Sequence, residues 1–160
     1  MAAILSSDGF RFLFRTDKGT VSRDVWWFGT TLISTVVLSF QIVWLLVSPH
    51  ATSDLSQRGL FDAAALGVYS FLIVYAFVAF LSGVCWYNLS AKRFRDRGLA
   101  PSFAGLPMVL ALLAGAAHWL APRMPEMVPP FVPYTLDIAL VLVILWCVFE
   151  LGLRPAAKVS

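Results

Sequence analysis

Four apolar runs, each close to the length that crosses a membrane as a helix, constrain this chain more than any other feature. They cover about residues 25–48, 63–91, 99–121 and 134–151, and the first three contain no Asp, Glu, Lys or Arg. A helix needs about 20 residues to span the hydrocarbon core, where its backbone groups can bond only to one another. With 59% hydrophobic residues, the sequence predicts an all-α integral membrane protein folded as a four-transmembrane-helix bundle.

These runs divide the chain into three parts. Residues 1–24 form an N-terminal arm in the cytoplasm or at the membrane interface, residues 25–151 form the membrane domain, and residues 152–160 form a cytoplasmic tail. Small residues spaced four apart, such as Ala79 and Gly83, let neighbouring helices approach closely. This spacing favours a compact bundle.

Capping residues support the limits of the runs. Ser22 and Asp62 are suited to begin the first and second helices, and Thr135 is suited to begin the fourth. Gly98, followed closely by a proline, is typical of a helix end. The five prolines within residues 122–133 predict a stiff linker on the outer side of the membrane.

Positive charge is distributed unevenly along the chain. Ten of the twelve Lys and Arg lie in the arm, the second loop and the tail, and two lie in the first and third loops. Because cytoplasmic loops retain Lys and Arg, this asymmetry predicts that both termini are cytoplasmic. Aromatic residues at the ends of the runs then form belts at the two interfaces: Trp26, Trp27, Trp86 and Tyr87 on the inner side, and Trp44, Trp119 and Tyr134 on the outer side.

The second loop is the densest polar segment in the chain. On a helix, Asp96 lies one turn beyond both Lys92 and Arg93, so this single acid can pair with either base. One interpretation of these charges is a topology anchor over anionic lipid headgroups. The other is a docking surface for a partner protein or a lipid. The candidate docking residues are Lys92, Arg93, Arg95, Asp96, Arg97 and, from the arm, Arg23.

Several motifs carry a family resemblance. Phe10, Phe12 and Phe14 precede Ser22-Arg23 and the pair Trp26-Trp27, and residues 93–98 (RFRDRG) precede a third run that contains Pro107. In these features the chain resembles domain of unknown function 805, a family of small bacterial inner-membrane proteins. The resemblance covers roughly residues 10–115. It implies a multi-pass architecture in the bacterial cytoplasmic membrane, and it implies no activity.

Candidate cofactor ligands and transport residues are few. His50 and His118 lack a partner at helical ligand spacing, Gln41 is suited to bond across to another helix, and Asp137 and Glu150 lie near helix ends. Cys85 and Cys147 are interpreted as packing residues. We therefore expect no bound cofactor or metal.

The sequence favours a non-catalytic accessory, assembly or scaffold subunit. Its expected partners are membrane lipids with anionic headgroups and other membrane proteins, with no nucleic acid among them. Two alternatives stay open: a small-solute carrier or channel, and a haem- or quinone-binding redox protein that uses one of the two histidines.

Overall fold

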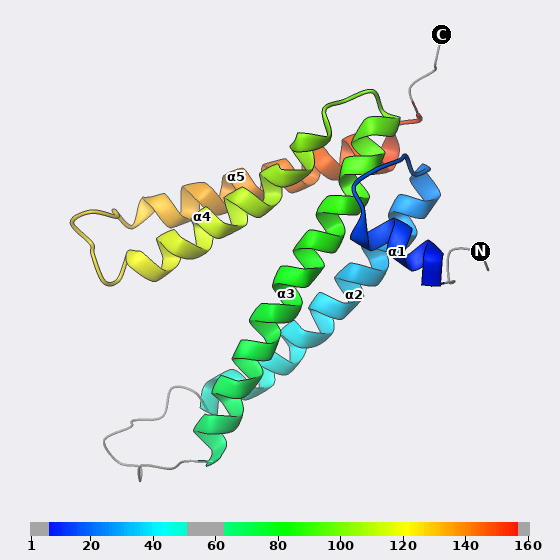
Figure 1. Ribbon diagram of the computed structural model, residues 1–160. Coiled ribbons are helices and arrows are strands. Elements are labelled where there is room, and N and C mark those ends of the chain that lie inside the picture. Colours follow the sequence, from blue (N-terminus) through cyan, green and yellow to red (C-terminus); the bar gives the residue numbers. More distant parts are fainter. Residues whose placement is uncertain (1–6, 51–62, 157–160) are drawn as a thin grey trace.

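Four long helices form two antiparallel hairpins. The computed structural model describes residues 7–50 and 63–156, and every regular element within these ranges is helical. The first hairpin joins α2 (Arg23–Val47) to α3 (Ala63–Asp96), and the second joins α4 (Leu106–Leu120) to α5 (Phe131–Cys147) (Figure 1). Four helical segments are long and apolar enough to cross a membrane. The predicted all-α fold with four helices suited to span a membrane is confirmed.

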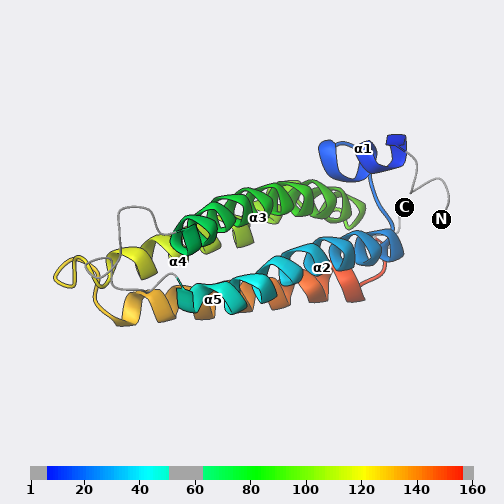
Figure 2. The same cartoon turned by 90° about the horizontal axis from the view of Figure 1, so that it is seen from below.

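Short helical elements complete the described chain. The arm contains α1 (Ser7–Arg15), which packs on the α3 side of the first hairpin (Figure 2). One turn of 3₁₀ helix, η1 (Ser48–His50), follows α2, and a second, η3 (Pro101–Gly105), leads into α4. A π-helical turn, η4 (Val148–Leu153), extends α5.

The two hairpins meet at one end and diverge from it, so the predicted compact bundle is wrong. Within each hairpin the helices pack along their length, whereas α3 and α4 approach each other closely only near η3 (Figure 1). The hydrophobic effect does not drive apolar helices together in lipid, so van der Waals packing and interhelical hydrogen bonds determine which parts of them associate. Among the described residues, the polar links between the hairpins all lie at the shared end.

Two of the predicted helix ends are confirmed. Ser22 caps α2, its Oγ accepting from the Val25 backbone N–H at 3.5 Å. Gly98 has a φ of +72° and follows the last turn of α3. Its N–H donates to the Arg95 carbonyl at 3.0 Å and the Leu99 N–H donates to the Phe94 carbonyl at 2.9 Å, the paired bonds of a Schellman motif. Asp62 lies outside the described residues.

The predictions around the third loop are wrong in detail. Residues 121–130 fold into turns, with the Val128 N–H donating to the Met124 carbonyl at 2.9 Å, instead of an extended linker. Helix α5 begins at Phe131, and Thr135 lies inside it, donating to the Phe131 carbonyl at 2.9 Å. Pro133 fits this first turn because its missing N–H would have no helical partner there. Helix α3 runs to Asp96, past the apolar run that ends at residue 91, and so includes the basic last turn that the sequence places before Gly98.

Candidate functional site: a polar junction where the hairpins meet

The last three turns of α3 form a polar cluster that we call the junction. Its side chains are those of Asn88, Ser90, Lys92, Arg93, Arg95, Asp96 and Arg97. Helix α3 has 34 residues, well over the roughly 20 that the hydrocarbon core requires, so its end can project beyond the core. The junction lies between α1 on one side and η4 on the other.

On one side, the junction binds the C-terminal end of α1. Lys92 Nζ donates to the carbonyl oxygens of Phe12 and Leu13, the latter at 2.9 Å, and Asn88 Nδ2 donates to the Phe14 carbonyl at 2.8 Å. These last carbonyls of a helix lack helical partners and carry its negative dipole end, which favours a cation. Lys92 is fully buried. Because its ammonium donates to these carbonyls, it caps the C-terminal end of α1.

Arg95 extends this contact into the segment that connects α1 to α2. Its Nη1 donates to the carbonyls of Asp17 and Gly19 at 2.7 and 2.8 Å. Gly19 has a φ of +93°, a conformation that glycine adopts without strain. The arm is thus held by three side chains from α3, all donating to its backbone.

On the other side, the junction binds the end of η4. Arg93 Nε donates to the Leu151 carbonyl at 3.0 Å, and Nη2 donates to the Arg154 carbonyl at 2.8 Å, while Nη1 pairs with Asp96. The guanidinium is 1% exposed. Five donors in a planar fork allow one arginine to serve three acceptors at once.

A buried carboxylate strengthens the same side. Glu150 Oε1 accepts from Arg97 Nη2 at 2.9 Å, and its Oε2 lies 3.1 Å from Arg154 Nη1. The Glu150 side chain is 6% exposed, and Arg97 also donates to the Pro155 carbonyl. A buried carboxylate is tolerated when it is paired in this way.

Two tryptophans tie α2 to the junction. Trp26 Nε1 donates to Ser90 Oγ and Trp27 Nε1 donates to the Gly152 carbonyl, both at 3.1 Å. A Cβ at Gly152 would lie 2.7 Å from Trp27 Cζ2, so only glycine permits this approach. Trp26 is fully buried and its indole N–H has its partner inside the protein, so it packs within the fold at the junction.

Five of the six predicted docking residues lie in the junction, and the sixth, Arg23, lies beside it. Lys92, Arg93, Arg95, Asp96 and Arg97 share the junction, whereas the half-exposed Arg23 pairs with its neighbour Asp24 at 3.6 Å. Arg23 lines the mouth of a polar cavity of about 380 Å³, to which Arg93 and Asp96 also contribute. Of the two bases that lie one turn before Asp96, Arg93 pairs with it, as the spacing allows, whereas Lys92 donates to α1.

Other polar residues lie elsewhere in the described chain. Tyr75 donates to Gln41 Oε1 at 2.6 Å across the first hairpin, which confirms the predicted interhelical bond of Gln41. His118 Nε2 and Asp137 Oδ2 are 2.8 Å apart across the second hairpin, a pair that the sequence analysis did not anticipate. The side chain of His50 lies outside what the structure describes, so its role stays open.

Sequence reasoning also missed the partners of the junction. Glu150 precedes Arg154 by four residues, a spacing typical of an ion pair on a helix. This spacing is the sequence feature from which that pair could have been predicted. The backbone carbonyls that Lys92 and Arg95 bind leave no pattern in a sequence. Comparison with family models, with curated proteins and with solved structures found no match to this chain.

Proposed function

We propose that the protein is a non-catalytic scaffold or accessory subunit that binds another membrane protein between its two hairpins. The supporting observation is an apolar crevice, which we call the wedge, where α3 and α4 begin to diverge. Its lining residues are Val84 and Tyr87 on α3, with Gly105, Met108, Val109 and Leu112 at η3 and α4.

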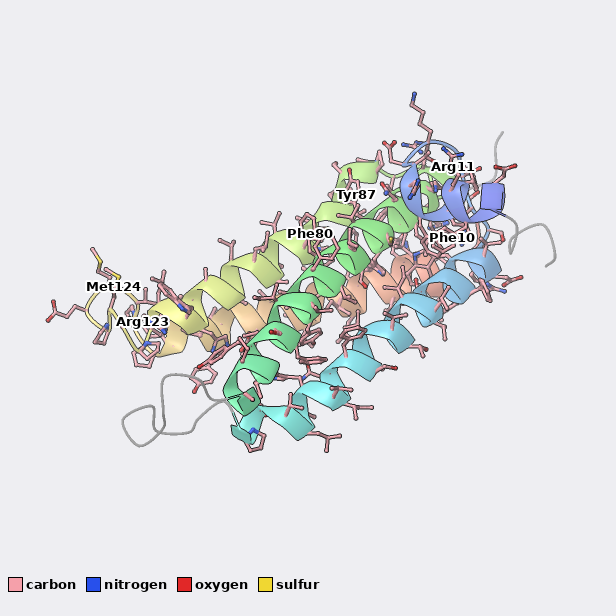
Figure 3. All side chains as sticks on the ribbon, turned by 60° about the horizontal axis from the view of Figure 1, so that its bottom comes forward. Phe10, Arg11, Phe80, Tyr87, Arg123 and Met124 are labelled. Carbon is pink, nitrogen blue, oxygen red and sulfur yellow. The ribbon has the colours of Figure 1, made fainter. Side chains whose placement is uncertain are left out.

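The wedge offers large apolar side chains to a partner. Phe80 lies one turn before Val84 on the same face of α3 and is 61% exposed, and Leu112 is 72% exposed. Figure 3 shows Phe80 and Tyr87 between α3 and α4. Gly115, one turn beyond Leu112, has nothing within 4 Å of a Cβ built on it, so a helix backbone can approach there.

The junction supports this role by holding the wedge open in one geometry. Within the described residues, the hairpins are joined at a single end by five hydrogen bonds, most of them buried or part-buried, so little conformational freedom is lost when a partner helix enters. Such preorganisation raises affinity because the free protein already has the bound shape. The basic residues of the junction serve this purpose from inside the protein.

We further propose that the protein resides in the bacterial cytoplasmic membrane with both termini inside. The bias of ten bases to two supports this orientation. The hydrogen bonds from Lys92, Arg95 and Arg97 also bring the arm and the end of η4 to the same end of α3. Reporters fused after Ser160 and inserted near Ser56 are expected to report opposite compartments, and a cytoplasmic signal at Ser56 would contradict the proposal.

Photocrosslinking in cells tests the docking proposal. A photoreactive residue is placed at Phe80 or Leu112 in the wedge. The matched control is Leu81, which lies on α3 beside Phe80 and is 44% exposed, but which lines a different groove. We expect a discrete protein adduct from both wedge positions and only lipid adducts from Leu81. Lipid adducts alone at all three positions would overturn the proposal.

A further inference from the structure

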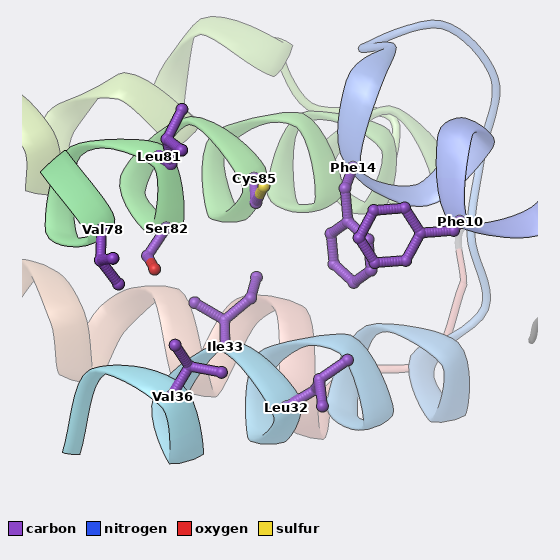
Figure 4. A pocket seen from close by; sticks show the side chains of 9 residues that line it. All are labelled: Phe10, Phe14, Leu32, Ile33, Val36, Val78, Leu81, Ser82 and Cys85. Carbon is purple, nitrogen blue, oxygen red and sulfur yellow. The ribbon is translucent and has the colours of Figure 1, made fainter. Parts of the chain in front are cut away.

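A second apolar groove lies between α2 and α3, on the side that carries α1. Figure 4 shows its lining, which comes from all three helices. Phe10 and Phe14 of α1 close one end, with Leu32, Ile33 and Val36 on α2 and Val78, Leu81 and Cys85 on α3. Between Val78 and Cys85 it follows about two turns of α3, on the order of 10 Å. Its volume is about 200 Å³ and its lining is almost entirely apolar.

Helix α1 places a row of bases beside this groove. Phe10 and Phe14 are one turn apart, with ring centroids 4.8 Å from each other, and both line the groove. Arg11 and Arg15 follow them by one residue each and so form a parallel row about 100° around the helix. Figure 3 shows Phe10 and Arg11 on different sides of α1.

The charges of this row differ from those of the junction. Arg11, Arg15 and Lys18 are exposed and have no hydrogen bond or ion pair with the described residues, whereas the junction bases donate to backbone carbonyls. Asp8 lies one turn before Arg11 on α1. The arm therefore carries net positive charge that the protein itself leaves unpaired. An apolar groove that ends at Phe10 and Phe14, each followed in sequence by an arginine, matches the two halves of an anionic phospholipid.

We propose that this groove binds one anionic phospholipid, with an acyl chain between α2 and α3 and its phosphate at Arg11 and Arg15. Arginine presents a planar set of donors that suits a phosphate group. Its aliphatic stem can lie along apolar surface while the guanidinium reaches headgroup level. None of the residues that line the wedge lines this groove, so the lipid site and the docking site can fail independently.

Native mass spectrometry of the detergent-solubilised protein tests the proposal. The full chain is titrated with phosphatidylglycerol or with phosphatidylcholine, and the dissociation constant of the first lipid adduct is measured. Each base close to an anionic headgroup is expected to strengthen lipid binding by about fivefold. Phosphatidylglycerol should therefore bind at least about fivefold more tightly than phosphatidylcholine. The double variant R11Q/R15Q should abolish this preference while still binding both lipids. The charge control R123Q, at the opposite end of α4, should retain it.

Groove-filling variants test the acyl-chain half of the site. Val36→Phe or Leu81→Phe places a ring in the groove at residues that are 40% and 44% exposed, so the protein is expected to fold. Either change should weaken the first adduct of both lipids severalfold, whereas Val109→Phe in the wedge should not. Equal affinity for the two lipids in the unmodified protein, or a preference that survives R11Q/R15Q, would overturn the proposal. An undiminished first adduct in both groove variants would also overturn it.

Discussion

The two ends of the helical hairpins are built on different principles. At the junction, the buried Lys92 and Arg93 and the half-buried bases beside them donate to backbone carbonyls from distant parts of the chain. Toward the opposite end, the described residues of α2 and α3 are joined by the hydrogen bond from Tyr75 to Gln41 and by the stacked rings of Phe40, Phe71 and Tyr75, with centroids about 6 Å apart. The basic segment at residues 92–97 resembles an exposed surface in sequence. In the structure its side chains link α3 to α1 and to η4 inside the fold.

The largest effect is expected from Arg93, because it serves both hairpins. Arg93→Met leaves the carbonyls of Leu151 and Arg154 and the carboxylate of Asp96 without their donor. Each lost hydrogen bond to a charged donor costs about 1.5–3 kcal/mol, and Arg93 makes three of them. We expect low membrane abundance and a sharply lowered midpoint of thermal unfolding in detergent. Arg23→Met, at a half-exposed base, is the control; equal behaviour of the two variants would remove the distinction between the junction and the surface.

Lys92 is expected to have a smaller and more local effect. Lys92→Met removes the ammonium that caps the carbonyls of Phe12 and Leu13, and hydrogen bonds to a charged group contribute about 1.5–3 kcal/mol each. Hydrogen exchange should therefore accelerate across α1 while α4 and α5 keep their protection. Lys18→Met, at an exposed base of the same arm, should leave the exchange of α1 unchanged. Acceleration spread evenly over all helices would show that Lys92 supports the whole fold.

The bond between Trp26 and Ser90 provides a finer measure of the junction. Trp26→Phe and Ser90→Ala each break it, and the double variant completes a mutant cycle. We expect a coupling free energy of about 1 kcal/mol in thermal unfolding, the net value of a neutral buried hydrogen bond. A coupling near zero would mean that the two side chains contribute only by packing.

The smallest effect is expected at the opposite end. Tyr75→Phe removes the donor to Gln41 Oε1, and interhelical hydrogen bonds in membrane proteins average about 0.6 kcal/mol. The unfolding midpoint should fall by less than it does for Trp26→Phe. A larger loss from Tyr75→Phe would reverse the comparison between the two ends.

Much of the fold follows from sequence because lipid imposes strict length requirements. The four runs, the cap at Ser22 and the end at Gly98 were all readable from composition and spacing. The start of α5 was not, because a proline-rich segment suits a helical first turn as well as an extended linker. The divergence of the two hairpins could not be predicted from sequence either, because small residues such as Ala79 and Gly83 permit close helix packing without requiring it.

The junction could be located from sequence but not interpreted. The cluster of charges at residues 92–97 identified the segment, yet a base above headgroups and a base that caps another helix have the same sequence pattern. Lys92 shows the difficulty most clearly, since its acceptors are backbone oxygens about 80 residues earlier in the chain. Arg11 and Arg15 differ from Lys92 in being exposed and in having no hydrogen bond or ion pair with the described residues.

Amine labelling of the unmodified protein tests the internal role of the junction most directly. The chain has an exposed lysine in the arm, Lys18, and a fully buried one, Lys92. The folded protein in detergent is treated with an amine-reactive ester, and modification at each site is followed over time by peptide mass spectrometry, with the protein unfolded in sodium dodecyl sulfate as a control. We expect Lys18 to react rapidly and Lys92 to react only after unfolding. Equal rates in the folded protein would contradict the burial of Lys92 and, with it, the internal role of the junction.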